Sequence, residues 1–316
     1  MRALLIVNPN ATSTTSATRD LLAHALESRT QLTVAPTQRR GHAAELAQWA
    51  VETGMDVVVV HGGDGTVNEV VNGMLPAPDA WTDADLTAPR PRLAIIPGGS
   101  ANVFARSLGI DSDPVVATND VIDLLEVDTQ RTVGLGHADG RWFLFTAGVG
   151  LDANVCRTMD RLREKGRTAT PGRYLRVTVR EFFAARGKEP MLTLELPGRE
   201  PVSGVHYAMI SNSSPWTFLN KRPIVTNPDT SFEKGLGVFA MRSTRVLGTL
   251  RVAERLLRGK PPVSKALARV DDVPRVVVRS TGPVGLQMDG DYVGQREVVQ
   301  FTAVQAALRV IAPKLG

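Results

Sequence analysis

The chain has 316 residues, a net charge of +5 and a hydrophobic fraction of 43%, which is typical of a globular protein long enough for two domains. Its single cysteine, Cys156, excludes an internal disulfide and a cysteine-rich metal cluster. No apolar run approaches the roughly 20 residues that a membrane-spanning helix needs. We therefore expect a cytoplasmic protein with anionic partners; nucleic acid is disfavoured, because aromatic residues make up only 5% of the chain.

Strands and helices alternate in the first part of the chain. The run from Val57 to Val60 is continuously apolar, as expected of a strand buried on both faces of a parallel sheet. This alternation predicts a doubly wound α/β domain over residues 1–130, with a surface insertion from Leu75 to Arg92. We expect strands at residues 2–9, 31–37, 55–66 and 92–99, and helices at residues 15–28, 41–54, 66–75 and 100–109.

Short segments of alternating polarity dominate residues 131–316. Their spacing between turn residues predicts an antiparallel β-sandwich or barrel. We also expect the extreme C-terminus to pack back on the first domain. The strand-like segments lie at residues 136–150, 191–214, 235–243, 274–293 and 296–313, and basic helical stretches interrupt them at residues 157–188 and 244–260.

Three glycines surround an aspartate at the end of the buried third strand. Gly62, Gly63 and Gly65 allow backbone N–H groups to approach an anion, and the helix expected to begin near Thr66 adds its positive N-terminal end. Asp64 would repel a phosphate unless it binds magnesium, a basic side chain or a hydroxyl proton. The alternative is a tight strand-to-helix turn with an aspartate cap. His61, just before the glycines, is expected to be structural.

Two further loops repeat this arrangement. Gly98, Gly99 and Ser100 follow the fourth strand, and Asn8, Thr12 and Ser13 follow the first. Ligands of open α/β sheets bind beyond the carboxyl ends of the strands. The three loops together therefore predict a phosphate-binding rim.

These segments also carry a family resemblance. "GGDGTVNEVVNG", preceded by "IVNPNA" and "TQRRGHAAELA" and followed by "IIPGGSANVFARSLGI", resembles the diacylglycerol kinase catalytic domain of bacterial lipid kinases and, more distantly, sphingosine and ceramide kinases. "LQMDGDYV" extends the resemblance to nearly the whole chain. It implies transfer of the γ-phosphate of ATP, with Mg²⁺, to a lipid hydroxyl, foremost that of diacylglycerol. It also implies an active site in a cleft between a nucleotide-binding domain and a β-sandwich lipid-substrate domain.

The resemblance assigns roles to particular positions. Asp291, with Asp289 beside it, would be the general base, and Asp64 would act through the magnesium of ATP. The residues alone favour a hairpin turn for Asp289-Gly290-Asp291, and it is the resemblance that favours the catalytic role. The nucleotide would contact Asn8, Pro9, Asn10, Ala11, Thr12, Thr37, Gly62, Gly63, Asp64, Gly65, Thr66, Val67, Asn68, Glu69, Gly98, Gly99 and Ser100.

Two departures from the family pattern affect charge. Val103 stands where the family often has an aspartate, which removes one acid from the expected network. Lys234 replaces another acid at a place where bacterial relatives can hold a structural magnesium, through the positions of Ser231, Lys234 and Leu236. We do not expect this metal to be kept, because a lysine side chain cannot coordinate it and only backbone carbonyls could.

Partners and alternatives stay open at this point. The basic stretch at residues 157–188 suits anionic headgroups at the inner face of a membrane, or it is an ordinary solvated helix face. A homodimer is left open. An NAD kinase-like enzyme would explain "GGDGT" but not the later motifs, and an inactive nucleotide-binding regulatory protein would explain Val103.

Overall fold

The computed structural model describes residues 1–12, 14–165, 171–185, 189, 191–219, 221–243, 245–260 and 262–314. The chain divides into two compact units. The first unit comprises Met1–Leu135, Gly140–Trp142 and Gln305–Gly316, and the second comprises Gly136–Asp139 and Phe143–Val304.

The first unit is built on a parallel sheet. Its strands follow the order β2, β1, β3, β4, and beyond β4 the end of β16 adds one further parallel pair, Val310 with Leu93. Every residue of β3 is buried, as its apolar run predicts. The strands are β1 (Arg2–Val7), β2 (Gln31–Pro36), β3 (Val57–Gly62), β4 (Arg92–Pro97) and β16 (Asp291–Val310).

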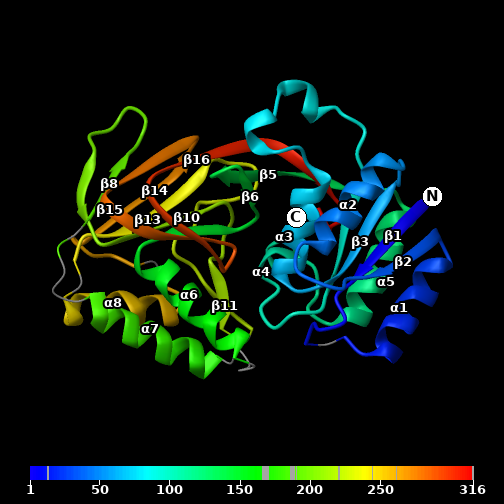
Figure 1. Cartoon of the computed structure of the whole chain (residues 1–316), viewed down its shortest axis with the longest axis horizontal. Coiled ribbons are helices and arrows are strands. Elements are labelled where there is room, and N and C mark those ends of the chain that lie inside the picture. Colours follow the sequence, from blue (N-terminus) through cyan, green and yellow to red (C-terminus); the bar gives the residue numbers. More distant parts are fainter. Residues whose placement is uncertain are drawn as a thin grey trace. The chain divides into compact units, whose positions relative to one another are not determined.

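Helices cover both faces of this sheet (Figure 1). Leu5 and Val59 face a core formed with α1 and α5, whereas the alternate residues point to the opposite face, where α2 packs against α3. Helices α2 and α3 approach closely: a Cβ at Gly73 of α3 would lie 2.1 Å from the carbonyl oxygen of Ala44 of α2. The helices are α1 (Ser16–Glu27), α2 (His42–Glu52), α3 (Asp64–Met74), α4 (Val103–Ser107) and α5 (Pro114–Glu126).

Several elements differ from the sequence expectations. The helix expected at residues 100–109 is only the five-residue α4, and α3 begins at Asp64 rather than near Thr66. The pattern analysis missed α5, although Asp113 and Pro114 are a typical N-cap and first helical residue. The insertion from Leu75 to Arg92 contains two short 3₁₀ helices, Pro78–Ala80 and Asp83–Leu86.

The second unit is an antiparallel sheet that folds over its own core. The strand order is β14, β13, β10, β7, β15, β16. The long β15 pairs with β8 through Val277–Ser280 and with β7 through Leu286–Met288, with an irregular register between these halves. The strands are β7 (Thr146–Val149), β8 (Leu192–Glu195), β9 (Val202–Val205), β10 (Tyr207–Ser211), β13 (Leu236–Met241), β14 (Leu267–Val273) and β15 (Arg275–Met288).

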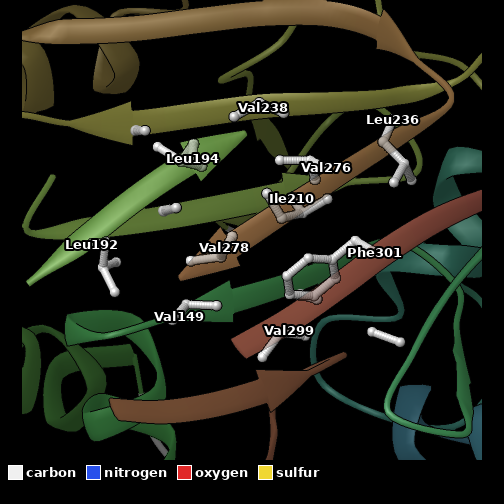
Figure 2. Close-up of a cluster of buried hydrophobic side chains, with 14 of the residues drawn as sticks. Val149, Leu192, Leu194, Ile210, Leu236, Val238, Val276, Val278, Val299 and Phe301 are labelled. Carbon is white, nitrogen blue, oxygen red and sulfur yellow. The ribbon is translucent and has the colours of Figure 1, made fainter. Parts of the chain in front are cut away.

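Side chains from both halves of this sheet meet in one cluster. Figure 2 shows Leu192 and Leu194 of β8 near Ile210 of β10, Val278 of β15 and Phe301 of β16. The alternation of buried and exposed residues along these strands therefore builds a sandwich-like core. A mixed α/β chain with a parallel unit and an antiparallel unit confirms the expected fold class.

The remaining helices and strands complete the two units. Among the described residues, no helix is long and apolar enough to cross a membrane. The basic stretch at residues 157–188 belongs to two helices rather than one, and its residues 166–170 and 186–188 lie outside the described part of the chain. The remaining elements are α6 (Leu151–Glu164), α7 (Pro171–Ala185), α8 (Val246–Leu257), β5 (Arg131–Ala138), β6 (Arg141–Phe143), β11 (Thr217–Leu219) and β12 (Arg222–Ile224).

Candidate functional site

The carboxyl ends of β1 and β3 lie next to each other at the point where the strand order of the first unit reverses. Open α/β sheets bind their ligands at such a point. Asn8, just after β1, donates from Nδ2 to Oγ1 of Thr66 at 2.9 Å, and its Oδ1 accepts the N–H of Asn10 at 3.0 Å. Asn8 therefore joins the loop after β1 to the first turn of α3.

The two glycine turns pack backbone against backbone. The N–H of Gly98 donates to the carbonyl of Gly62 at 2.8 Å. A Cβ at Gly99 would lie 2.7 Å from the Cα of Gly63, closer than real Cβ atoms come to other atoms. Packing between the loops therefore explains these glycines without any ligand.

Gly65 is different. It is exposed at the start of α3, and a Cβ there would have no atom of the chain within 4 Å. The protein's own packing gives no reason for this glycine. The open space lies at a helix N-terminus, where backbone N–H groups and the helix dipole favour an anion.

The carboxyl of Asp64 has a structural partner. Its Oδ1 accepts the N–H of Phe104 at 3.1 Å, so it caps the start of the short α4. Burial raises the pKa of Asp64, and hydrogen bonds from the backbone of Val103, Phe104 and Asn102 act in the opposite direction. Arg106, on the same short helix, adds a nearby positive charge. Asp64, which lies in the first glycine turn, is thus linked to the second glycine turn through α4, the helix that follows Gly98 and Gly99.

Two residues outside the expected nucleotide set also hold these loops. Asn102 has a positive φ of 48° and closes the second glycine turn, accepting the N–H of Gly99 at 2.9 Å and donating to its carbonyl at 2.8 Å. His61 is fully buried, and burial lowers its pKa. Its Nδ1 lies 3.2 Å from the carbonyl of Ile96, so the neutral ring donates there and accepts the hydroxyl of Thr14 at Nε2. The structural role expected for His61 agrees with these contacts.

The other expected nucleotide contacts lie along the same edge with different exposure. Val67 and Asn68 are buried, and Asn68 donates from Nδ2 to the carbonyl of Trp142 at 3.0 Å, so both side chains serve the packing of α3. Ser13 lies outside the described residues. Exposed or partly exposed at this edge are Pro9, Asn10, Ala11, Thr12, Thr37, Glu69 and Ser100.

The expected acidic pair belongs to the second unit, and its two members have different surroundings. Asp289 and Gly290 form the two-residue turn between β15 and β16, with φ values of 49° and 85° as this type of hairpin requires. The carboxylate of Asp289 is buried and accepts the N–H groups of residues 144, 145 and 146 at 2.7, 3.0 and 3.1 Å. Asp289 therefore anchors the turn. Asp291, the first residue of β16, keeps partial exposure.

The residues expected for a structural magnesium do not fit one. Nζ of Lys234 donates to the carbonyl of Asp229 at 3.1 Å, and the carbonyl of Ser231 accepts the N–H of Lys234 at 3.1 Å. A cation here would have to compete with this ammonium group. Over the described part of the chain, no cluster of three or more His, Cys, Asp or Glu side chains could hold a metal ion.

Comparison with known proteins finds a family model that matches the part of the chain holding this site. Residues 2–134 match the family model of the diacylglycerol kinase catalytic domain. This segment contains the parallel sheet, both glycine turns and the loop after β1. This segment of the chain is therefore similar to the diacylglycerol kinase catalytic domain, as its motifs predict.

Individual relatives extend the comparison. The chain is 37% identical over 114 residues to a diacylglycerol kinase of Staphylococcus haemolyticus, which covers 36% of this chain and 30% of that protein. It is 25% identical over 282 residues to a diacylglycerol kinase of Bacillus subtilis, covering 87% and 83% of the two chains. A crystal structure of a diacylglycerol kinase from Bacillus anthracis has a TM-score of 0.71 at 19% identity, covering 99% and 97%, so it shows the same fold.

Proposed function

We propose that this protein is an ATP-dependent lipid kinase, which transfers the γ-phosphate of ATP to a lipid hydroxyl and most simply converts diacylglycerol to phosphatidic acid. The observation that carries the proposal is Gly65. It leaves open space at a helix N-terminus beside the strand-order reversal, inside the segment that matches the family. Backbone N–H groups at a helix N-terminus favour an anion such as a phosphate.

Different residues of the chain would bind the phosphates and accept the proton of the lipid hydroxyl. The backbone at Gly63 to Gly65 and the exposed Ser100 would bind phosphate oxygens. Since Oγ1 of Thr66 accepts from Asn8, its proton can point to a phosphate oxygen. Asp291 would take the proton of the lipid hydroxyl as that oxygen bonds to the γ-phosphorus, and the bond to the β-phosphate breaks to release ADP. ATP with Mg²⁺ would supply the phosphoryl group and a cation that offsets its charge. Asp64, whose Oδ1 caps α4, would contact the ion through water.

A catalytic test separates this proposal from its alternatives. Radiolabelled γ-phosphate transfer would be measured in mixed micelles for diacylglycerol, a sphingoid base, a polyprenol and a glycolipid, beside NAD. We expect label in one lipid class, and a loss of roughly 10²- to 10⁴-fold in kcat for Asp291→Asn. The matched control is Glu200→Gln, an exposed acid of the same unit, which should keep full activity.

Other outcomes would assign another function. Label in NAD would make the protein a small-molecule kinase. ATP binding without label in any acceptor would favour a regulatory protein that has lost catalysis. An Asp291→Asn variant as active as the wild type would remove Asp291 from the reaction.

A lipid acceptor requires access to a membrane surface, and α8 offers the best-supported docking face. Its leucines at 247, 250 and 257 are 73%, 59% and 48% exposed, whereas Val252 is buried on the other side. Arg251 is exposed on the leucine side, and the exposed Arg258 pairs there with Glu254 at 3.0 Å. Exposed leucines flanked by cations suit the anionic face of a membrane, so we propose peripheral binding there, to which the exposed Phe183 of α7 would add.

Vesicle sedimentation tests this docking face. We expect binding to vesicles of phosphatidylcholine with phosphatidylglycerol, weak binding to phosphatidylcholine alone, and loss of binding in Leu250→Glu. Leu21→Glu is the matched control, because Leu21 is 54% exposed on α1 in the first unit. Equal binding by Leu250→Glu would refute the assignment, and a change in oligomeric state instead would mean that a second copy covers α8.

A further inference from the structure

A chain of partly buried hydrogen bonds joins α6 to the turn that carries Asp289. Gln287 of β15 is 1% exposed. Its Oε1 accepts the N–H of Gly290 at 2.9 Å, and its Nε2 donates to Oδ2 of Asp152 at 2.6 Å. The N–H of Gly290 can only donate, so it fixes Oε1 toward the turn and Nε2 toward α6. The amide therefore has one orientation, and that orientation needs an acceptor on Asp152.

The sheet leaves room for this pair at one glycine. Gly148 of β7 lies opposite Gln287 in the register of the two strands. A Cβ at Gly148 would lie 2.2 Å from Oδ2 of Asp152 and 2.8 Å from Nε2 of Gln287. Any larger residue would push the carboxyl and the amide apart. The strand next to β15 is thus shaped around the contact between Asp152 and Gln287.

The surroundings of Asp152 make its carboxyl easier to protonate than that of an exposed aspartate. Burial raises the pKa of Asp152 to about 6, and the hydrogen bond from Gln287 acts in the opposite direction. Among the elements packed on this end of α6, β7 supplies Gly148, β15 supplies Gln287, and β10 supplies Tyr207, whose pKa is raised by burial and by the charge of Asp152. On α7, Glu181 accepts from Thr158 further along α6. The described contacts of Asp152 therefore include no cation that would hold it ionised.

We propose that Asp152 is a positioning residue: through Gln287 it holds the Asp289–Gly290 turn, and so it fixes where β16 begins and where Asp291 presents its carboxyl. The ionised carboxylate accepts a charge-assisted hydrogen bond from Gln287, which is stronger than one between neutral groups. Protonation of Asp152 weakens that bond and loosens the turn. The assignment of Asp291 as the base rests on the proposed kinase function, whereas the coupling of Asp152 to the turn does not.

The first experiment needs no catalysis. The full chain is labelled with ¹⁵N-glycine, and the amide signal of Gly290, assigned by its loss in Gly290→Ala, is followed from pH 5 to 8. We expect the signal to move with a midpoint near the Asp152 pKa of about 6, and to stay fixed in Asp152→Asn, which keeps an acceptor oxygen but does not titrate. The control is Asp139→Asn, which removes a carboxylate of the same unit that is paired with Arg296. In this variant the Gly290 signal should move with pH as it does in the wild type. An identical titration in Asp152→Asn, or none in the wild type, would overturn the proposal.

The second experiment uses the phosphate transfer itself. Below the Asp152 pKa, kcat of the wild type should fall, and this acid limb should disappear in Asp152→Asn. Gln287→Met removes both hydrogen bonds and should lower kcat roughly 10- to 100-fold, because a small misplacement of a reacting group costs that much, while KM for ATP stays within about twofold. Gln287→Glu should regain part of the loss only at acidic pH, where one of the two facing carboxyls is protonated. If Gly290 titrates as expected but no acceptor is phosphorylated, the kinase function fails and the positioning role stands.

Discussion

Gly65 and Gly99 provide a matched test of what the glycines of this site are for. Gly99→Ala places a Cβ 2.7 Å from the Cα of Gly63 and 2.9 Å from Oδ1 of Asn102, so the two turns must separate. Overpacking of this kind costs about 1–3 kcal/mol of unfolding free energy. Gly65→Ala meets no atom within 4 Å and lies inside α3. Alanine should stabilise the helix there by about 0.5–1 kcal/mol.

The two variants should also differ in nucleotide binding. If phosphate oxygens approach the backbone at Gly65, the new methyl group occupies their space, and the Kd for ATP should rise at least tenfold, which is about 1.4 kcal/mol. Urea unfolding and titration calorimetry with ATP would measure both effects. A Gly65→Ala variant that is more stable and binds ATP as the wild type would refute the assignment of this space to phosphate. A Gly99→Ala variant of unchanged stability would refute the packing argument.

Three further substitutions test the buried charges. Asp289→Asn turns one acceptor of backbone N–H groups into a donor and should cost about 2–4 kcal/mol in urea unfolding; a cost below about 0.5 kcal/mol would mean that the turn does not depend on this anchor. The pKa of Asp152 is raised from 3.8 to about 6, so its contribution to stability is present below pH 4 and is lost as pH rises through 6, by roughly 3 kcal/mol at most. The unfolding free energy of Asp152→Asn should therefore rise relative to that of the wild type as pH increases over that range. A difference between the two proteins that does not change with pH would contradict this. Burial lowers the pKa of His61, so stability should fall as pH drops below its unfolded value of about 6.5; thermal unfolding of His61→Gln should show a weaker fall between pH 7 and 5, and an equal fall would assign the effect to other groups.

The parallel sheet of the first unit was readable from local signals. The apolar run before Gly62 marks a strand buried on both faces, and Gly54 marks the end of a helix. The hairpin at Asp289–Gly290 is likewise a local signal, because both residues tolerate a positive φ. These features depend on neighbouring residues alone.

The roles of the individual acids depend on tertiary contacts and could not be predicted from the sequence. Asp64 and Asp289 look alike in sequence as acids beside glycines, yet one caps α4 and the other binds three backbone N–H groups of a distant segment. The contact between Asp152 and Gln287 joins residues 135 positions apart. Its only local signal is a glycine at position 148, whose reason is visible only when the strand pairing is known. The short α4 also depends on Asn102, because its positive φ delays the start of the helix.

The last strand, β16, belongs to both units, so the folding of each depends on the same strand. β16 starts at Asp291 in the second unit and ends at Val310 beside Leu93 in the first, where the following Ile311 fills part of the core. A fragment that stops at Leu135 would leave the edge of β4 unpaired and a hole where Ile311 packs. The segment that matches the family model, residues 2–134, is thus shorter than the first unit, which also includes residues 305–316. Any exchange of the first unit between related chains must therefore include the end of β16 as well as residues 1–135, and β16 is the strand that begins at Asp291 in the second unit.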